Sequence, residues 1–187
     1  MRVSFFTTLK YIEILDYIEV LKLLVQTHMK QPKTNALRLL DAANIKYETV
    51  TYQVDESDLS ATHVAEQLGE DISCVFKTLV LRGDRTGIFV CIIPGDKEVD
   101  LKKAARASGN KSCAMIRMQE LLPLTGYIRG GCSPIGMKRP YPMYIHESCR
   151  DFEKIYVSAG CRGMQVRLST KDLICYANIS IADVIND

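Results

Sequence analysis

The sequence predicts an α/β protein of the α+β class, a single domain with a central mixed, mostly antiparallel sheet and helices around it. Three observations lead to this prediction. The chain has 187 residues, the size of one ordinary domain. Hydrophobic residues make up 47% and charged residues 25%, as in globular proteins with a packed core. Helix-like and strand-like segments are mixed without strict βαβ alternation, which disfavours a purely parallel sheet.

The segment 1–28 precedes the pattern of a compact domain. Its aromatic and aliphatic residues are interrupted by charged residues, namely Lys10, Glu13, Asp16, Glu19 and Lys22. No apolar run is therefore long enough to cross a bilayer, and none has the form of a signal-peptide core. We interpret 1–28 as an N-terminal extension, either an amphipathic helix or residues upstream of a natural start at Met29, and we place the domain at 33–187.

A helix, a strand and a second helix are expected first in the domain. Thr34 has the side chain of an N-cap, and the apolar residues of 35–43 share one helix face. The segment 46–52 alternates and is rich in β-branched and aromatic residues, which is typical of a strand. Ser60 then begins a helix, and Gly69 suits the left-handed conformation at its C-terminal end.

The clearest supersecondary unit is a β-hairpin over 76–93, in which the turn-rich segment 82–87 separates two apolar runs. Further strands are predicted at 143–145, 155–157 and 164–168. Further helices are predicted at 100–108, 118–122 and 169–177. The last of these helices begins with Ser169 and Asp172 at the spacing of a capping box.

The seven cysteines are an odd number, scattered along the chain, and none forms a Cys-x-x-Cys pair. This pattern disfavours both a disulfide framework and a zinc site, so we predict no metal. Together with the missing signal peptide it predicts free thiols in a reducing cytoplasm.

Charge is unevenly distributed, although the net charge is only +2. The segment 41–75 has eight acidic residues and one basic residue, whereas 97–139 has nine basic and three acidic residues. Such a basic region fits either a phosphate backbone or a solvated helix face. The glycine-rich loop within it favours a nucleic-acid ligand.

Two glycine-bearing loops are candidate binding sites. The segment 126–136 has four glycines and a proline, and Lys138 and Arg139 follow it. Glycine lets the backbone approach a ligand closely, and consecutive N–H groups can bind an anion or a developing oxyanion. The second loop, 158–163, directly follows a predicted strand, where sites are often built. Simple turns are the alternative interpretation for both.

Lys77 is the most informative single residue. It begins a strand that otherwise reads as buried, and lysine is rarely buried without a partner. Lys77 therefore either lies at the rim of the sheet or directs its ammonium into a pocket, toward a phosphate or a carbonyl oxygen.

From about residue 33 to residue 184, the sequence resembles the YbaK/EbsC family of transfer-RNA editing domains. The matching blocks follow the family's order: Lys-Thr-Asn-Ala at 33–36, Thr51-Tyr52, Phe76-Lys77-Thr78-Leu79, Leu101 to Ala104, Gly126 to Gly136, Ile155 to Ser158 and Arg162-Gly163. The resemblance implies a YbaK-like fold and deacylation of mischarged tRNA in trans, most often Cys-tRNA(Pro), without a cofactor. It implies tRNA and, as a possible partner, prolyl-tRNA synthetase, in the cytoplasm and away from membranes.

The resemblance also implies roles for ten residues. Lys77 matches the family's essential lysine, Tyr52 its pocket tyrosine, and Gly130 with Pro134 the Gly-x-x-x-Pro loop that holds the terminal adenosine and the carbonyl. The implied catalytic residues are Lys77, Tyr52 and Gly130. The implied substrate-binding residues are Gly131, Ser133, Pro134, Ser158, Gly160, Arg162 and Gln165. The nucleophile in the YbaK branch is the thiol of the substrate's own cysteinyl group.

Two departures from the family keep alternatives open. Gln165 stands where the best-known YbaK members have an acid, which leaves room for another substrate, such as the alanyl group of Ala-type prolyl editing. His146 stands where those members have an aspartate, so a Cys132–His146 nucleophile–base pair is a rival mechanism. We favour structural roles for Cys132 and His146. A noncatalytic module that binds tRNA or the synthetase is the third hypothesis, which the presence of Lys77 disfavours.

Overall fold

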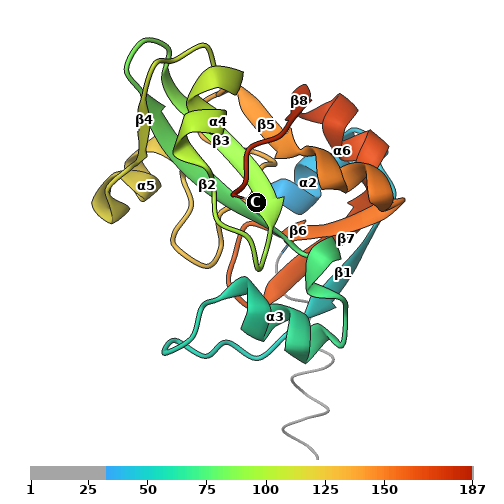
Figure 1. The fold of residues 1–187 in the computed structure, drawn as a ribbon. Helices are drawn as coiled ribbons and strands as arrows, with labels where there is room; N and C mark the ends of the chain where they lie inside the picture. The colour runs from blue at the N-terminus through green and yellow to red at the C-terminus, as the bar shows by residue number, and fades with distance from the viewer. Residues whose placement is uncertain (1–32, 187) are drawn as a thin grey trace, which may run out of the picture. The chain divides into compact units, whose positions relative to one another are not determined.

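The computed structural model describes residues 33–186, and the extension predicted at 1–28 lies outside them. Eight strands of the described residues form two sheets (Figure 1). The larger sheet has the order β4-β2-β3-β5-β8, formed by Cys113–Met115, Phe76–Gly83, Gly87–Pro94, Met143–His146 and Ile179–Ala182. The smaller sheet has the order β1-β7-β6, formed by Tyr47–Thr51, Met164–Ser169 and Lys154–Ser158.

The strand directions confirm the predicted mixed, mostly antiparallel arrangement. The smaller sheet is antiparallel throughout, and β2 pairs antiparallel with both β3 and β4. Only the β3–β5 and β5–β8 pairs of the described strands are parallel. The five-stranded sheet is the predicted mixed sheet, and the three-stranded sheet is an additional one. The two remain separate because Val75 and Tyr156 form only an isolated bridge just before β2, and the ladder does not continue from one sheet into the other.

Five α-helices of the described residues accompany the sheets: α2 Asn35–Ala42, α3 Ala61–Leu68, α4 Leu101–Ala107, α5 Met118–Thr125 and α6 Thr170–Tyr176. The predicted N-cap of α2 is present, since Thr34 Oγ1 accepts a hydrogen bond from the Leu37 N–H at 3.2 Å. The predicted end of α3 is also present, because Gly69 has a φ of 66°. Local side-chain chemistry thus sets the ends of these helices.

Three features of the fold were not predicted. The short strands β4 and β8 lie at the two edges of the larger sheet (Figure 1). Helix α5 does not stop after one turn but continues through Pro123 to Thr125, whose hydroxyl donates to the Leu121 carbonyl at 2.7 Å. Two 3₁₀ turns, η1 at Ile72–Cys74 and η2 at Glu147–Asp151, fill connections.

Strand β3 divides the apolar interior into two layers. Val90 and Ile92 face the larger layer, which also contains residues of α2 and of the smaller sheet. Phe89, Cys91 and Ile93 face a second layer beneath α4. All five side chains are fully buried, so β3 packs on both faces. This shared core fixes the neighbouring strand β2, on which the site is built. In residues 33–186, no helix has the length and apolar character needed to cross a membrane.

Candidate active site

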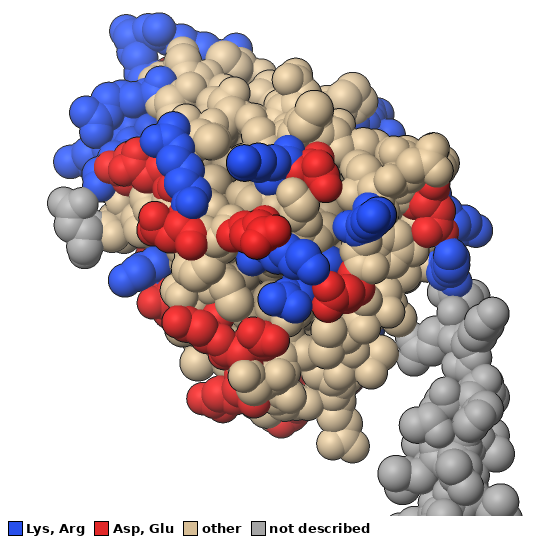
Figure 2. All heavy atoms as spheres, turned by 90° about the vertical axis from the view of Figure 1, so that its right-hand side faces the viewer, with Lys and Arg blue, Asp and Glu red and all other residues tan. Residues whose placement is uncertain are grey.

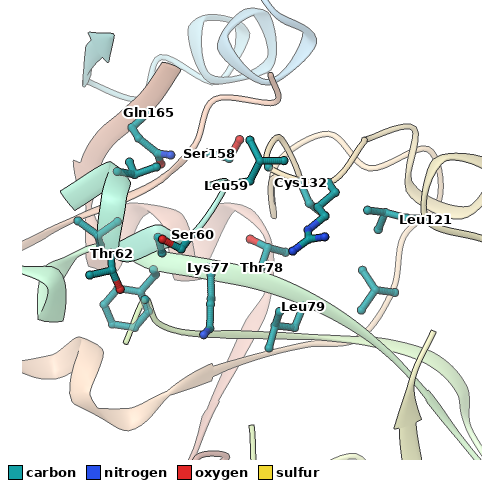
Figure 3. A pocket seen from close by; sticks show the side chains of 18 of the residues that line it. Leu59, Ser60, Thr62, Lys77, Thr78, Leu79, Leu121, Cys132, Ser158 and Gln165 are labelled. Carbon is teal, nitrogen blue, oxygen red and sulfur yellow. The ribbon is translucent and has the colours of Figure 1, made fainter. Parts of the chain in front are cut away.

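A cavity of about 460 Å³ lies beside the first half of β2 (Figure 3). Its walls come from α3, the loop between β3 and α4, the β4–α5 region, and both glycine loops. Five of the ten residues implied by the resemblance line it: Tyr52, Lys77, Gly130, Ser158 and Gln165. Lys77 and Gly130 therefore share one cavity, as the sequence predicted, while the roles of the ten residues stay predictions.

The other five implied residues do not line the cavity: Gly131, Ser133, Pro134, Gly160 and Arg162. Their contacts shape the two glycine loops. A Cβ atom at Gly131 would lie 3.1 Å from the backbone of Cys161, closer than most Cβ contacts, so the two loops pack tightly against each other there. Ser133 is fully buried, and its Oγ accepts from the Ile135 N–H at 3.2 Å. Local packing alone therefore explains why Gly131 and Ser133 occupy their positions.

Arg129 is a cavity residue that the sequence analysis did not single out. Its carbonyl accepts a hydrogen bond from Arg162 Nε at 2.9 Å, and Arg162 in turn pairs with Glu56 at 3.2 Å. Arg162 thus holds the backbone of Arg129 in place between the two loops. Only the position of Arg129 in a basic, glycine-rich loop could have indicated it.

Lys77 is the second residue of β2, and its side chain is 24% exposed. Its Nζ lies 3.3 Å from Oε1 of Glu98, which also lines the cavity. Among the described residues, four charged side chains line the cavity: Lys77, Asp96, Glu98 and Arg129. Asp96 pairs with Lys97 at 3.7 Å, so the Arg129 guanidinium is the one lining charge in residues 33–186 without an ion-pair partner.

Two buried oxygens at the cavity have no hydrogen-bond partner. They are Oγ1 of Thr78 and Oε1 of Gln165, and both residues line the cavity. Gln165 is only 6% exposed. Buried polar atoms are normally satisfied, so these two oxygens suggest a polar ligand. Thr78 does not stand out in the sequence, because a threonine within a strand is an ordinary β-former.

Acidic and basic segments lie at different ends of the molecule. In Figure 1, α3 of the acidic segment is at the bottom, and α4, α5 and β4 of the basic segment are above. The side view of Figure 2 shows acidic side chains gathered toward the lower end and basic ones above them. The cavity has walls from both segments. Among residues 33–186, no group of three or more His, Cys, Asp or Glu side chains is arranged to hold a metal ion.

The structure does not bring together the rival pair Cys132 and His146. Cys132 lines the cavity, but burial raises the pKa of its thiol to about 12, which disfavours the thiolate form. His146 is 7% exposed and does not line the cavity. Its Nδ1 lies 3.8 Å from Oδ1 of Asp183 and accepts from the Val184 N–H at 3.5 Å. These contacts support the structural roles that the sequence analysis favoured.

Limited alkylation with iodoacetamide at pH 8 should leave Cys132 largely unmodified. With a pKa of about 12, roughly one Cys132 thiol in ten thousand is a thiolate at that pH, and the thiolate is the reactive form. The exposed Cys175 serves as the control in the same sample. Peptide mapping by mass spectrometry measures both sites, and labelling of Cys132 should rise with pH. Rapid labelling of Cys132 at pH 7 would instead favour an activated nucleophile.

Comparison with known proteins places the cavity in a family context. The family model described as "Aminoacyl-tRNA editing domain" matches residues 56–176. The chain is 46% identical over 154 residues to EbsC of Enterococcus faecalis, whose name provisionally describes a Cys-tRNA(Pro)/Cys-tRNA(Cys) deacylase; the match covers 82% of this chain and 94% of EbsC. It is also 32% identical over 79 residues to the proline–tRNA ligase of Fervidobacterium nodosum, covering 42% of this chain and 14% of the ligase.

The fold recurs in solved structures, of which two illustrate the likeness. The crystal structure of the hypothetical protein APE2540 has a TM-score of 0.73 at 22% identity and covers 80% of this chain and 97% of its own. A protein provisionally named as a trans-editing enzyme for prolyl tRNA synthetase has a TM-score of 0.69 at 24% identity, covering 82% of this chain and 99% of its own. At these identities the likeness supports the YbaK-like fold alone.

Proposed function

We propose, because the chain belongs to the family of aminoacyl-tRNA editing domains, that it deacylates mischarged tRNA in trans and that Cys-tRNA(Pro) is its principal substrate. The observation that carries the proposal is the shared cavity of Lys77 and Gly130, which also contains unpartnered buried oxygens. The match covers 94% of EbsC, and the name of EbsC supports the choice of a cysteinyl substrate.

Different residues of the cavity bind different parts of the substrate. The Lys77 ammonium polarises the ester carbonyl, and the glycine loop at Gly130 lets the terminal adenosine approach the backbone closely. Tyr52 and Ser158 border the aminoacyl group, and Gln165 offers its carboxamide oxygen to a donor of the substrate. Gly131, Ser133, Gly160 and Arg162 act through the loops that they hold in shape, and Pro134 is buried within the first of these loops.

Arg129 fits the polynucleotide part of the substrate. An aminoacyl ester carries an α-ammonium and no free carboxylate, so the anions near the ester are the phosphates of the acceptor strand. A guanidinium without an ion-pair partner among the described residues attracts such a phosphate and repels the α-ammonium. The carboxylates of Asp96 and Glu98 instead repel a phosphate and attract the α-ammonium. These charges favour one orientation of the substrate in the cavity.

The protein supplies no nucleophile in this proposal. The substrate's thiol sulfur attacks the ester carbonyl carbon, the bond from that carbon to the ribose oxygen breaks, and the thiol proton is transferred to the departing ribose oxygen. The products are a cyclic thiolactone and free tRNA, and water then opens the thiolactone to cysteine. Fixing the two reacting groups near each other can supply a large part of the rate in such an intramolecular step.

Gln165 supports a second candidate substrate, an alanyl group on the same tRNA. A carboxamide cannot ionise, so it lacks the charge that an acid at this position would provide, and a neutral wall accepts a plain methyl side chain more easily. An alanyl group carries no nucleophile, so its removal would require an attacking water molecule.

The partner and the compartment belong to the same proposal. The similarity to proline–tRNA ligases covers only part of this chain, and it supports prolyl-tRNA synthetase as the enzyme whose errors are corrected. All seven cysteines are free thiols, which suits the reducing cytoplasm.

A panel of charged tRNAs tests the function. Purified full-length protein is mixed with Cys-tRNA(Pro), Ala-tRNA(Pro), Pro-tRNA(Pro) and Cys-tRNA(Cys), and loss of the ester is followed over time. We expect rapid loss from Cys-tRNA(Pro) and no acceleration with Pro-tRNA(Pro). Preference for Ala-tRNA(Pro) would replace the proposed substrate by the second candidate. Binding of every tRNA without ester loss would establish the noncatalytic module instead.

A further inference from the structure

Strand β2 has two edges, an inner one that faces β3 and an outer one on the opposite side. The outer edge has a gap at the cavity. The inner edge pairs with β3 along the whole strand. On the outer edge, β4 pairs with Leu81 to Gly83, and the Ile116 N–H donates to the Val80 carbonyl at 3.2 Å. At the other end, Val75 bridges to Tyr156 of β6. Between Val75 and Val80, no described strand pairs with the outer edge.

The backbone of Thr78 points into this gap. In an antiparallel strand the N–H and C=O of one residue point to the same edge, and the direction alternates from residue to residue. The Val80 carbonyl points outward, to Ile116, so the N–H and C=O of Thr78, two residues earlier, point outward too. The opposite strand agrees, because Val90, the register partner of Val80, directs its N–H away from β2 to the Pro142 carbonyl at 2.9 Å.

Thr78 therefore brings three polar groups to the cavity, and none of the described ladders pairs its backbone at this edge. Its N–H and C=O lie at the open edge, and its Oγ1 is buried without a partner. In Figure 3 the Thr78 side chain lies on the side of β2 that faces Ser60 and Ser158, whereas Lys77 extends to the other side. An unpaired strand edge in a cavity is a template for adding one more strand-like segment.

An aminoacyl ester offers one hydrogen-bond donor and one acceptor, as the backbone N–H and C=O of a single strand residue do. Its α-ammonium donates and its ester carbonyl accepts, and in an extended conformation both point to the same side, as in a residue of an antiparallel pair. The donor and acceptor of Thr78 are complementary to this arrangement. No other part of the aminoacyl ester offers such a pair.

We propose that the open edge of β2 at Thr78 binds the aminoacyl group as a one-residue β-strand. The Thr78 C=O accepts from the α-ammonium, and the Thr78 N–H donates to the ester carbonyl oxygen, where negative charge develops as the sulfur attacks. This inference rests on the proposed function and deepens it, because it explains how amino acids with different side chains can be held with the ester in one position.

The pairing also places the substrate's side chain. Residues directly opposite each other in an antiparallel pair project their side chains from the same face. The side chain of an L-aminoacyl group would therefore lie beside Oγ1 of Thr78, near Ser158, and a D-aminoacyl group would direct it toward the Lys77 side. The buried, unpartnered Thr78 hydroxyl would then lie next to a thiol or hydroxyl of the substrate.

NMR spectroscopy of the ¹⁵N-labelled full chain tests this pairing. The probe is 3′-deoxy-3′-(L-cysteinylamino)adenosine, in which a stable amide replaces the ester. We expect the Thr78 amide proton to move downfield and to exchange with solvent at least about tenfold more slowly in the complex. Leu79 is the matched control, because its register with Cys91 already pairs its N–H within the ladder. A probe without the α-amine should bind about tenfold to a hundredfold more weakly.

The outcomes separate this inference from the proposed function. If the probe binds and shifts residues of the cavity but leaves the Thr78 amide unchanged, the pairing is wrong and the editing function stands. If the probe does not bind, both are wrong. Thr78→Val keeps the backbone N–H and the β-branched shape, so the amide at position 78 should still shift. Loss of that shift would assign binding to the hydroxyl and overturn the backbone pairing.

Discussion

Replacing Lys77 with alanine should lower the rate of Cys-tRNA(Pro) deacylation by about 10²–10³-fold, the usual loss when one donor to a developing oxyanion is removed. The Lys77 ammonium is the cation that β2 itself contributes to the cavity. The substrate's thiol would still be near the ester in the variant, so residual activity above the uncatalysed rate is expected. Single-turnover deacylation with excess enzyme measures the effect, because it isolates the ester cleavage from product release.

The same substitution should hardly change stability. The Lys77–Glu98 pair involves a glutamate whose side chain is 78% exposed, and solvent-screened pairs contribute less than about 1 kcal/mol. Thermal unfolding of Lys77→Ala should therefore resemble that of the unsubstituted protein. Lys102→Ala is the matched control, since Lys102 is exposed on α4 and does not line the cavity. Wild-type activity in Lys77→Ala would contradict the role given to this residue.

Local signals account for the parts of the fold that the sequence predicted. The Thr34 cap, the helix end at Gly69 and the hairpin of β2 and β3 depend on residues close together in the chain. The division into two sheets depends on whether β2 continues its ladder onto β6, a contact between residues 75 and 156. Short strands such as β4 carry too few residues for a periodic pattern.

The sequence indicated a site residue only where that residue is unusual in its context. Lysine at the start of an apolar strand is rare, so Lys77 stood out. Thr78 did not, because its importance lies in an unpaired backbone edge that exists only once β4 and β6 are in place. Arg162 matched a family position, but only its bond to the Arg129 carbonyl reveals that it acts on the loop. The roles of Thr78 and Arg162 both depend on contacts between segments that are far apart in the sequence.

A substrate with serine in place of cysteine should react about 10²-fold more slowly, or slower still, with the unsubstituted enzyme. A thiol is partly ionised near neutral pH, whereas a hydroxyl needs a general base, whose contribution is typically about 10²–10⁴-fold. Cys132 does not supply this base, because burial raises the pKa of its thiol to about 12. Parallel assays of Cys-tRNA(Pro) and Ser-tRNA(Pro) measure the ratio, and mass spectrometry of the small product should detect the thiolactone before free cysteine.

The enzyme variants complete this test of who supplies the nucleophile. Cys132→Ser and His146→Ala should keep most activity on Cys-tRNA(Pro), because neither side chain takes part in the proposed bond changes and His146 lies outside the cavity. Circular dichroism of both variants separates a chemical effect from unfolding. If folded Cys132→Ser is inactive on every substrate and an acyl-enzyme can be trapped on the unsubstituted protein, the substrate's thiol is not the nucleophile. The neutral Gln165 would then mark a cavity that accepts side chains without a thiol.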